Sequence, residues 1–337
     1  MDLNHHECYP TGSLVLRVCQ FRHGRLTDES LSQWYIKVNL KYVLKYNYVM
    51  LGCKALGGIM KYTIVTDSCC NLFAKDLDSS KIAFHVAPII LTVGDQEFID
   101  DENLDTKNFI AKMKACKTHA KSACPSPEAF AKIMRENDNV IVLTLSSKLS
   151  GTYASAMAAA ESVKEQFPDK KLFVLDSLIA SAGQDVILLK LKELIECDKY
   201  NFDEITVKLA EIRSRTKVRF LLQDLTNLIK NGRLGKVVGT ILNTLKVKLI
   251  CGENGAGEIK KYGMAMSTKK GLASLAEYPR NNETDSLITI AHAHNEEDAS
   301  FVKRLLESKF GFKKIRLLLM RGTSTLYASD KGIVIAY

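Results

Sequence analysis

The sequence lacks a hydrophobic run long enough to cross a membrane. No apolar stretch reaches the ~18 residues that a transmembrane helix requires, although 46% of the residues are hydrophobic. We therefore expect a soluble protein with no transmembrane segment. The nine cysteines include no CxxC pair and no Cys/His spacing typical of a zinc site. This pattern predicts reduced thiols in a cytoplasmic protein, with no metal and no cofactor.

Concentrated positive charge is also missing. The net charge of +9, from 47 basic and 38 acidic residues, is mild for 337 residues. The lysines are distributed along the whole chain. Nucleic-acid binders typically gather basic and aromatic side chains in one patch. We therefore expect no nucleic-acid partner.

The motifs of common catalytic sites are absent as well. Ser150 is followed by Gly151 but lacks the preceding glycine of the G-x-S-x-G elbow of serine hydrolases. No motif ties a histidine to Ser150, and the chain has no G-x-x-x-x-G-K-[ST] phosphate-binding loop. These absences favour a binding protein that is not an enzyme.

Residues 1–59 differ in character from the remainder of the chain. They contain the only tryptophan, Trp34, but no sustained helical or strand periodicity. Met60 then opens a sequence that runs directly into a strand pattern, as a natural protein start would. We expect residues 1–59 to be a non-native or disordered extension, followed by domains at residues 60–217 and 218–337.

Strand and helix patterns alternate between residues 62 and 217. Strands are expected at 62–66, 82–91, 140–145 and 171–175, and helices at 109–116, 127–136, from 151 and from 201. Pro88 interrupts the second strand, which places that strand at a sheet edge or bends it. Such alternation is typical of an α/β domain with a mostly parallel sheet.

After Lys217 the pattern changes to strands joined by short turns. Strands are expected at 218–222, 247–251, 287–291, 315–320 and 333–337, helices at 224–230, 273–278 and 296–309, and a further apolar segment at 237–245. The glycine-rich segment Gly252–Glu258 predicts a hairpin between antiparallel strands. This arrangement favours an α+β second domain.

The stretch Asn139–Ala160 changes abruptly from an apolar strand to a helix of small residues. Between the two lie Ser146, Ser147, Ser150, Gly151 and Thr152. Hydroxyls and free N–H groups, placed between the carboxyl end of a strand and the start of a helix, form an anion site. The alternative is that Ser150 is only the N-cap of its helix.

Two other strands of this region end in an Asp-Ser pair. Asp67 and Ser68 follow the first strand, and Asp176 and Ser177 follow the strand at 171–175. Asp-Ser after a strand is a common helix-capping device. The carboxyl edge of a parallel sheet is, however, also where ligands bind in open α/β folds. Both interpretations stay open at this point.

The order of several short motifs resembles the DegV family. These motifs are TDS at 66–68, SACPSP at 122–127, SSKLSGT at 146–152, LDS at 175–177, L-x-x-L-x-x-x-G-R-L at 225–234 and L-x-x-L-x-V-K at 242–248. The resemblance covers residues 61–337. It implies a two-domain α/β protein that binds a long-chain fatty acid between its domains. In many bacteria such proteins present the fatty acid to a fatty acid kinase.

The resemblance also implies which residues hold the fatty acid carboxylate. These are the hydroxyls of Ser122 and Ser150. The strand-end argument given above, and not the resemblance, adds supporting positions at Ser146, Ser147, Gly151, Thr152, Asp67 and Ser68. Neither motif contains an arginine, so we expect hydroxyl and N–H groups to satisfy the carboxylate without a buried cation. Burial of about fifteen tail carbons at ~0.8 kcal/mol each would contribute about 12 kcal/mol before entropy costs.

Two positions depart from the family pattern. Met266 stands where the family often carries an arginine before a lysine pair, and Ala328 stands where it carries a histidine. The resemblance associates both positions with transfer of the carboxylate to the kinase, so it supports binding more directly than kinase partnership. A phosphate- or other small-anion-binding protein is the alternative function. We expect His292 and His294 to be structural.

Overall fold

The computed structural model describes residues 61–116, 118–235 and 248–337. These residues belong to one unit of the chain, which extends from Ile59 to Tyr337. The expected extension at 1–59 and the apolar segment at 237–245 lie outside the described residues. The domain boundary expected at residue 217 stays a prediction.

A parallel sheet of four strands has the order β2-β1-β6-β7. Its strands are β1 (Tyr62–Asp67), β2 (Ile82–Ala87), β6 (Asn139–Thr144) and β7 (Lys171–Asp176). Ile64 and Ile141 belong to one core cluster, whereas Val65 and Val142 belong to another. Successive side chains of a strand point to opposite faces, so both faces of this sheet are buried. This double burial accounts for the nearly all-apolar strand sequences.

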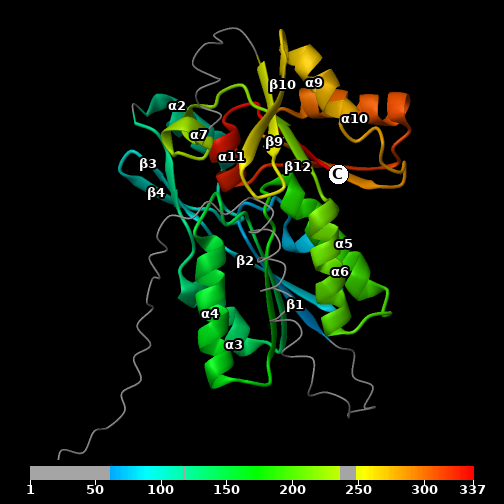
Figure 1. Ribbon diagram of the computed structural model, residues 1–337. Helices are drawn as coiled ribbons and strands as arrows, with labels where there is room; N and C mark the ends of the chain where they lie inside the picture. Colours follow the sequence, from blue (N-terminus) through cyan, green and yellow to red (C-terminus); the bar gives the residue numbers. More distant parts are fainter. Residues whose placement is uncertain (1–60, 117, 236–247) are drawn as a thin grey trace, which may run out of the picture. The chain divides into compact units, whose positions relative to one another are not determined.

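Helices cover both faces of the parallel sheet. They are α3 (Pro127–Glu136), α4 (Thr152–Gln166), α5 (Ala182–Glu196) and α6 (Phe202–Arg215). Helices α3 and α4 lie side by side (Figure 1), and Phe130 and Ala156 share the core cluster of Val65. Val186 of α5 belongs to the cluster on the other face. Pro127 begins α3, as predicted, because its fixed φ suits the first turn of a helix.

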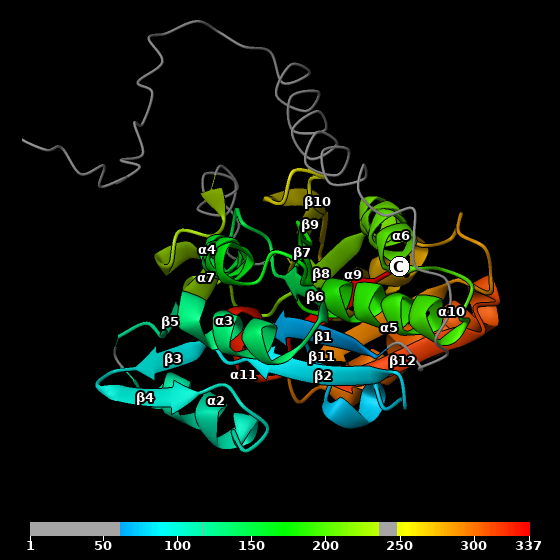
Figure 2. The ribbon, with the colours of Figure 1, turned by 90° about the horizontal axis from the view of Figure 1, so that it is seen from below.

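Pro88 divides the expected strand 82–91 into two strands of different sheets. The first part is β2, at the edge of the parallel sheet, as predicted for a strand that ends at a proline. The second part is β3 (Ile90–Val93), the central strand of an antiparallel sheet with β4 (Gln96–Ile99) and β5 (Lys121–Ala123). The assignment of residues 82–91 to a single strand was therefore wrong, whereas the predicted interruption at Pro88 is confirmed. Helix α2 (Thr106–Ala115) lies beside this small sheet (Figure 2).

The strands that follow Lys217 form a second, six-stranded sheet in the order β10-β9-β8-β13-β11-β12. They are β8 (Val218–Leu221), β9 (Lys248–Glu253), β10 (Ile259–Ala265), β11 (Leu287–His292), β12 (Lys314–Leu319) and β13 (Ile333–Ala336). Only β11 and β12 pair in parallel. The antiparallel pairing of β9 with β10 confirms the predicted hairpin.

Four helices and one short 3-10 helix complete the described part of the chain. They are η1 (Ala74–Asp76), α7 (Thr226–Lys230), α9 (Thr268–Glu277), α10 (Glu296–Phe310) and α11 (Gly322–Ala328). Helices α9 and α10 pack against each other and cover one face of the six-stranded sheet, where Leu275 and Val302 share a core cluster with Ile288. The other face packs against α5, which contacts β11 and β13.

Helix α5 connects the cores of the two sheets. Val186 of α5 belongs to one cluster with Ile141 of the parallel sheet and Val334 of the six-stranded sheet. The predicted fold class, an α/β part with a parallel sheet followed by an α+β part, is confirmed.

Candidate functional site

A cavity with an empty volume of about 880 Å³, part of it open to solvent, adjoins the carboxyl edge of the parallel sheet. Its walls come from residues on both sides of Lys217. Most of them are apolar, and include Leu145, Leu149, Ile179, Phe220, Leu222 and Val334. Small-molecule sites typically have mostly apolar walls with a few polar groups. The cavity therefore has the lining of a site for an apolar ligand.

Ser122 and Ser150 both line this cavity. Ser122 lies on β5, paired with Leu91 of β3, and its hydroxyl is 2.8 Å from the hydroxyl of Tyr327. Ser150 lies in the turn between β6 and α4, and its hydroxyl is 2.9 Å from that of Thr152. The tertiary structure thus brings the two hydroxyls that the sequence singled out to one cavity. Their role in holding a ligand stays a prediction.

The turn before α4 begins the helix without a side-chain N-cap. Gly151 occupies the N-cap position, while the Ser150 hydroxyl accepts a hydrogen bond from the N–H of Thr152 at 3.3 Å. A Cβ added at Gly151 would lie 3.3 Å from the sulfur of Cys124. The loops that carry Ser122 and Ser150 therefore approach each other closely, and a side chain at Gly151 would force them apart.

The other hydroxyls of this turn do not line the cavity. Ser146 is buried, donates to the carbonyl of Gly257 at 2.7 Å and accepts from the N–H of Lys148 at 3.2 Å. The backbone N–H of Ser147 donates to the carboxylate of Asp176 at 3.1 Å. These contacts hold the turn in place. Among the hydroxyl-bearing residues of the turn, Ser150 is the one that lines the cavity.

Asp67 and Ser68 lie behind the wall and position it. The buried carboxylate of Asp67 accepts from the N–H of Leu145 at 2.7 Å and from that of Cys69 at 3.0 Å. Burial raises the pKa of Asp67 to about 6. The Ser68 hydroxyl accepts from the N–H of Ile89 at 3.0 Å. Because Leu145, Cys69 and Ile89 all line the cavity, this Asp-Ser pair shapes the wall from outside it.

Arg233 and Tyr327 are cavity residues that the sequence-based reasoning missed. The Nε of Arg233 donates to the carbonyl of Leu149 at 3.1 Å, and its guanidinium lies 5.9 Å from the ring centre of Tyr327. The structure thus places a partly buried cation on the cavity wall. The expectation that the carboxylate is held without a buried cation stays a prediction. Arg233 follows Ser150 by more than eighty positions, and only folding brings the two to one cavity. The sequence signal that could have pointed to Arg233 is the G-R-L part of the motif at 225–234.

The two positions that depart from the family pattern lie in different places. Ala328 is buried and lines the cavity, where it contributes no titratable group. Met266 is 73% exposed and does not line the cavity. His292 and His294 are also outside the lining. His292 accepts from the N–H of Asn295 at 3.2 Å, and His294 lies 2.8 Å from the hydroxyl of Thr106.

No group of three or more His, Cys, Asp or Glu side chains in the part of the chain that the structure describes is arranged to hold a metal ion. Among the same residues, no helix is both long and apolar enough to cross a membrane.

Comparison with known proteins identifies one family. The model of a family described as "Uncharacterised protein, DegV family" matches residues 61–337. A DegV domain-containing protein of Streptococcus pyogenes serotype M18 is 31% identical over 279 residues, which cover 82% of this chain and 99% of that protein.

Solved structures show the same similarity. A DegV family protein from Ruminococcus gnavus, refined with vaccenic acid, is 29% identical, with a TM-score of 0.77 over 83% of this chain and 100% of that chain. The Fatty Acid Kinase (Fak) B3 protein of Streptococcus pneumoniae, loaded with linoleic acid, is 28% identical, with a TM-score of 0.76 over 82% of this chain and 99% of that chain.

Proposed function

This chain belongs to the DegV family, and we propose that it binds a long-chain fatty acid non-covalently, with the carboxylate at Ser122 and Ser150 and the tail in the apolar cavity. The observation that carries this proposal is that both hydroxyls line one cavity whose other walls are mostly apolar. The similar proteins from Ruminococcus gnavus and Streptococcus pneumoniae hold vaccenic acid and linoleic acid, respectively.

The polar groups of the cavity suit a carboxylate. Each hydroxyl is already hydrogen-bonded to a second hydroxyl, Ser122 to Tyr327 and Ser150 to Thr152. Hydroxyls rotate, so each pair has a proton to redirect toward an anion. The half-buried guanidinium of Arg233 adds the positive charge that compensates a carboxylate taken from water.

The same lining argues for binding without catalysis. No histidine lines the cavity among the residues that the structure describes, so Ser122 and Ser150 have no adjacent imidazole to act as base. Burial raises the pKa of the Cys69 thiol, which lies on the cavity wall, far above its usual range and leaves it a poor nucleophile. We propose that the protein carries its ligand unchanged, in the cytoplasm, where the cysteines that are unpaired in the described part of the chain stay reduced.

We further propose that the protein transfers its bound fatty acid to a fatty acid kinase. The support is the similarity to the Streptococcus pneumoniae protein that is named as part of that kinase. The small-anion alternative is less well supported, because phosphate has no apolar part to match walls such as Leu145 and Phe220.

The test is the identity of what the protein carries. The full chain, purified from bacteria, is examined by native mass spectrometry and then extracted under denaturing conditions for lipid analysis. We expect a fatty acid at about one molecule per chain, a ratio set by the single cavity proposed as the site. The proposal would be contradicted if the protein is purified without a bound fatty acid and also fails to bind added fatty acids in a titration. Binding of inorganic phosphate instead would favour the small-anion alternative.

A further inference from the structure

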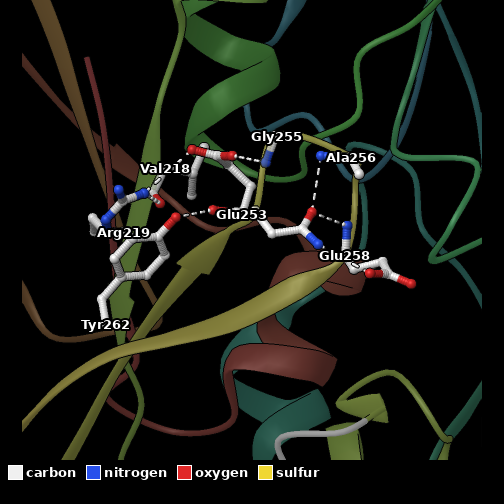
Figure 3. A network of polar contacts seen from close by, with 8 residues as sticks. Val218, Arg219, Glu253, Gly255, Ala256, Glu258 and Tyr262 are labelled. Carbon is white, nitrogen blue, oxygen red and sulfur yellow. Dashed lines mark hydrogen bonds and ion pairs between the residues drawn. The ribbon is translucent and has the colours of Figure 1, made fainter. Parts of the chain in front are cut away.

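A charged residue lines the cavity in addition to the groups proposed to hold the carboxylate. Glu253, the last residue of β9, is 8% exposed and belongs to the cavity wall. Its carboxylate lies 3.3 Å from Nη1 of Arg219 and accepts from the N–H of Gly255 at 2.5 Å (Figure 3). Ser181, Glu258, Thr323 and Ser324 line the cavity as well. Glu253 differs from them in bringing a buried carboxylate to the described wall.

The surroundings of Arg219 hold this position in place. The buried guanidinium lies 3.5 Å from the ring centre of Tyr262, and Nη1 also donates to the carbonyl of Val218 at 2.7 Å (Figure 3). The ring centre of Tyr278 is 5.1 Å from the guanidinium. A Cβ at Gly252, opposite Arg219 in the sheet, would lie 2.9 Å from that same Nη1. The arginine is thus packed between rings and backbone, and Glu253 is its carboxylate partner.

The polar partners of Glu253 differ from those of the proposed carboxylate site. The side chain of Glu253 contacts Arg219 and Gly255, whereas Ser122 contacts Tyr327. An ionised carboxylate has about four lone-pair sites, and these two contacts occupy two of them. The remaining sites are available to a hydrogen-bond donor inside the cavity.

We infer that the cavity takes a fatty acid with a hydroxyl group on its chain, and that this hydroxyl donates a hydrogen bond to Glu253. This inference rests on the proposed function, because the acid end must occupy the site of Ser122 and Ser150. The methylene groups of an unsubstituted chain would cover the carboxylate of Glu253. They would displace water from it without offering another hydrogen-bond donor. A hydroxyl at the matching carbon replaces that water by a charge-assisted hydrogen bond. A hydroxyl at a carbon that faces the apolar part of the wall would lose its water without replacement and weaken binding.

The experiment compares stearic acid with a series of monohydroxystearic acids whose hydroxyl moves along the chain. Each is titrated against the full-length protein by isothermal calorimetry. We expect the best isomer to bind about tenfold more tightly than stearic acid, as one added hydrogen bond to a charged group predicts. The preference should disappear in the double variant Arg219→Leu/Glu253→Leu, which removes both charges and leaves neither unpaired.

The matched control is Lys309→Leu/Glu277→Leu, which removes an exposed ion pair of 3.1 Å outside the cavity lining. This variant should keep the preference. Stearic acid binding as tightly as every hydroxylated isomer would overturn the inference and leave the proposed function standing. A preference that persists without Arg219 and Glu253 would overturn it too. Failure of every acid to bind would overturn both.

Discussion

Ser122 and Tyr327 are joined by a hydrogen bond of 2.8 Å, although 205 positions separate them in the chain. The contact links strand β5 of the small antiparallel sheet to helix α11, which precedes the last strand of the six-stranded sheet. The hydroxyl proposed to hold the ligand is therefore placed by two distant parts of the chain, and the following predictions test this arrangement.

Replacement of Ser150 by alanine should weaken fatty acid binding. The bound carboxylate would lose a donor inside a mostly apolar cavity, at a cost of ~1 to 3 kcal/mol in binding free energy. Calorimetric titration with one fatty acid gives the difference. Ser162→Ala is the control, because it removes an exposed hydroxyl of the same helix. Equal affinities of the wild type and Ser150→Ala would argue against the assigned carboxylate site.

Arg233 should distinguish a fatty acid from the corresponding fatty alcohol. Arg233→Gln removes the positive charge from the cavity wall, so we expect a loss of about 1.5 kcal/mol or more in binding of the acid. The alcohol, which carries no charge, should lose much less. Measuring both ligands on both proteins separates the charge effect from any disturbance of the Leu149 contact. A loss of the same size for acid and alcohol would show that Arg233 acts through packing.

The buried aspartates should make stability fall as the pH rises. Burial raises the pKa of Asp185 to about 7 and that of Asp67 to about 6, above the usual value of 3.8. The folded state therefore holds protons that the unfolded state releases. This stability is fully present below a pH of about 4 and is lost as the pH rises through about 6 to 7.

The change with pH is measurable by urea unfolding. From about pH 5 to about pH 8, Asp185 alone should lower the free energy of unfolding by roughly 2 to 3 kcal/mol. Asp185→Asn should flatten this dependence, whatever its effect on absolute stability through the contacts with Asn71. The exposed Asp169→Asn is the control. A variant at Asp185 that keeps the full dependence would contradict the assignment.

Gly257 at the tip of the β9–β10 hairpin should resist substitution more than its neighbour Gly255. Both have positive φ, +90° and +84°, so alanine strains the backbone at either position. Only at Gly257 would the new Cβ lie 2.5 Å from the Ser146 hydroxyl. We expect Gly257→Ala to destabilise the protein by about 1 to 2 kcal/mol more than Gly255→Ala. Equal costs in urea unfolding would show that the hairpin tip moves away from Ser146 without penalty.

Local sequence signals account for much of the secondary structure. The helix predicted at Pro127–Glu136 has the observed bounds. The helix predicted from residue 201 begins with a capping box of Asn201 and Glu204. Short-range chemistry decides such features: the fixed φ of proline, a side chain that reaches the third N–H, and the two-residue period of a strand. Pro88 shows the limit of such local signals. The proline predicted that its strand would lie at a sheet edge or bend, but it did not predict which sheet the following residues would join.

The sequence by itself determined the fold class, because the fold class follows from periodicity. Through its resemblance to the DegV family, the sequence also singled out the two serines that the structure brings to one cavity. The tertiary structure alone decided which of the hydroxyls reaches the cavity wall. It also placed Arg233 and Tyr327 beside Ser122 and Ser150, and Glu253 beside Arg219. Contacts between residues so far apart depend on how helices and sheets pack, and no local pattern in the chain encodes that packing.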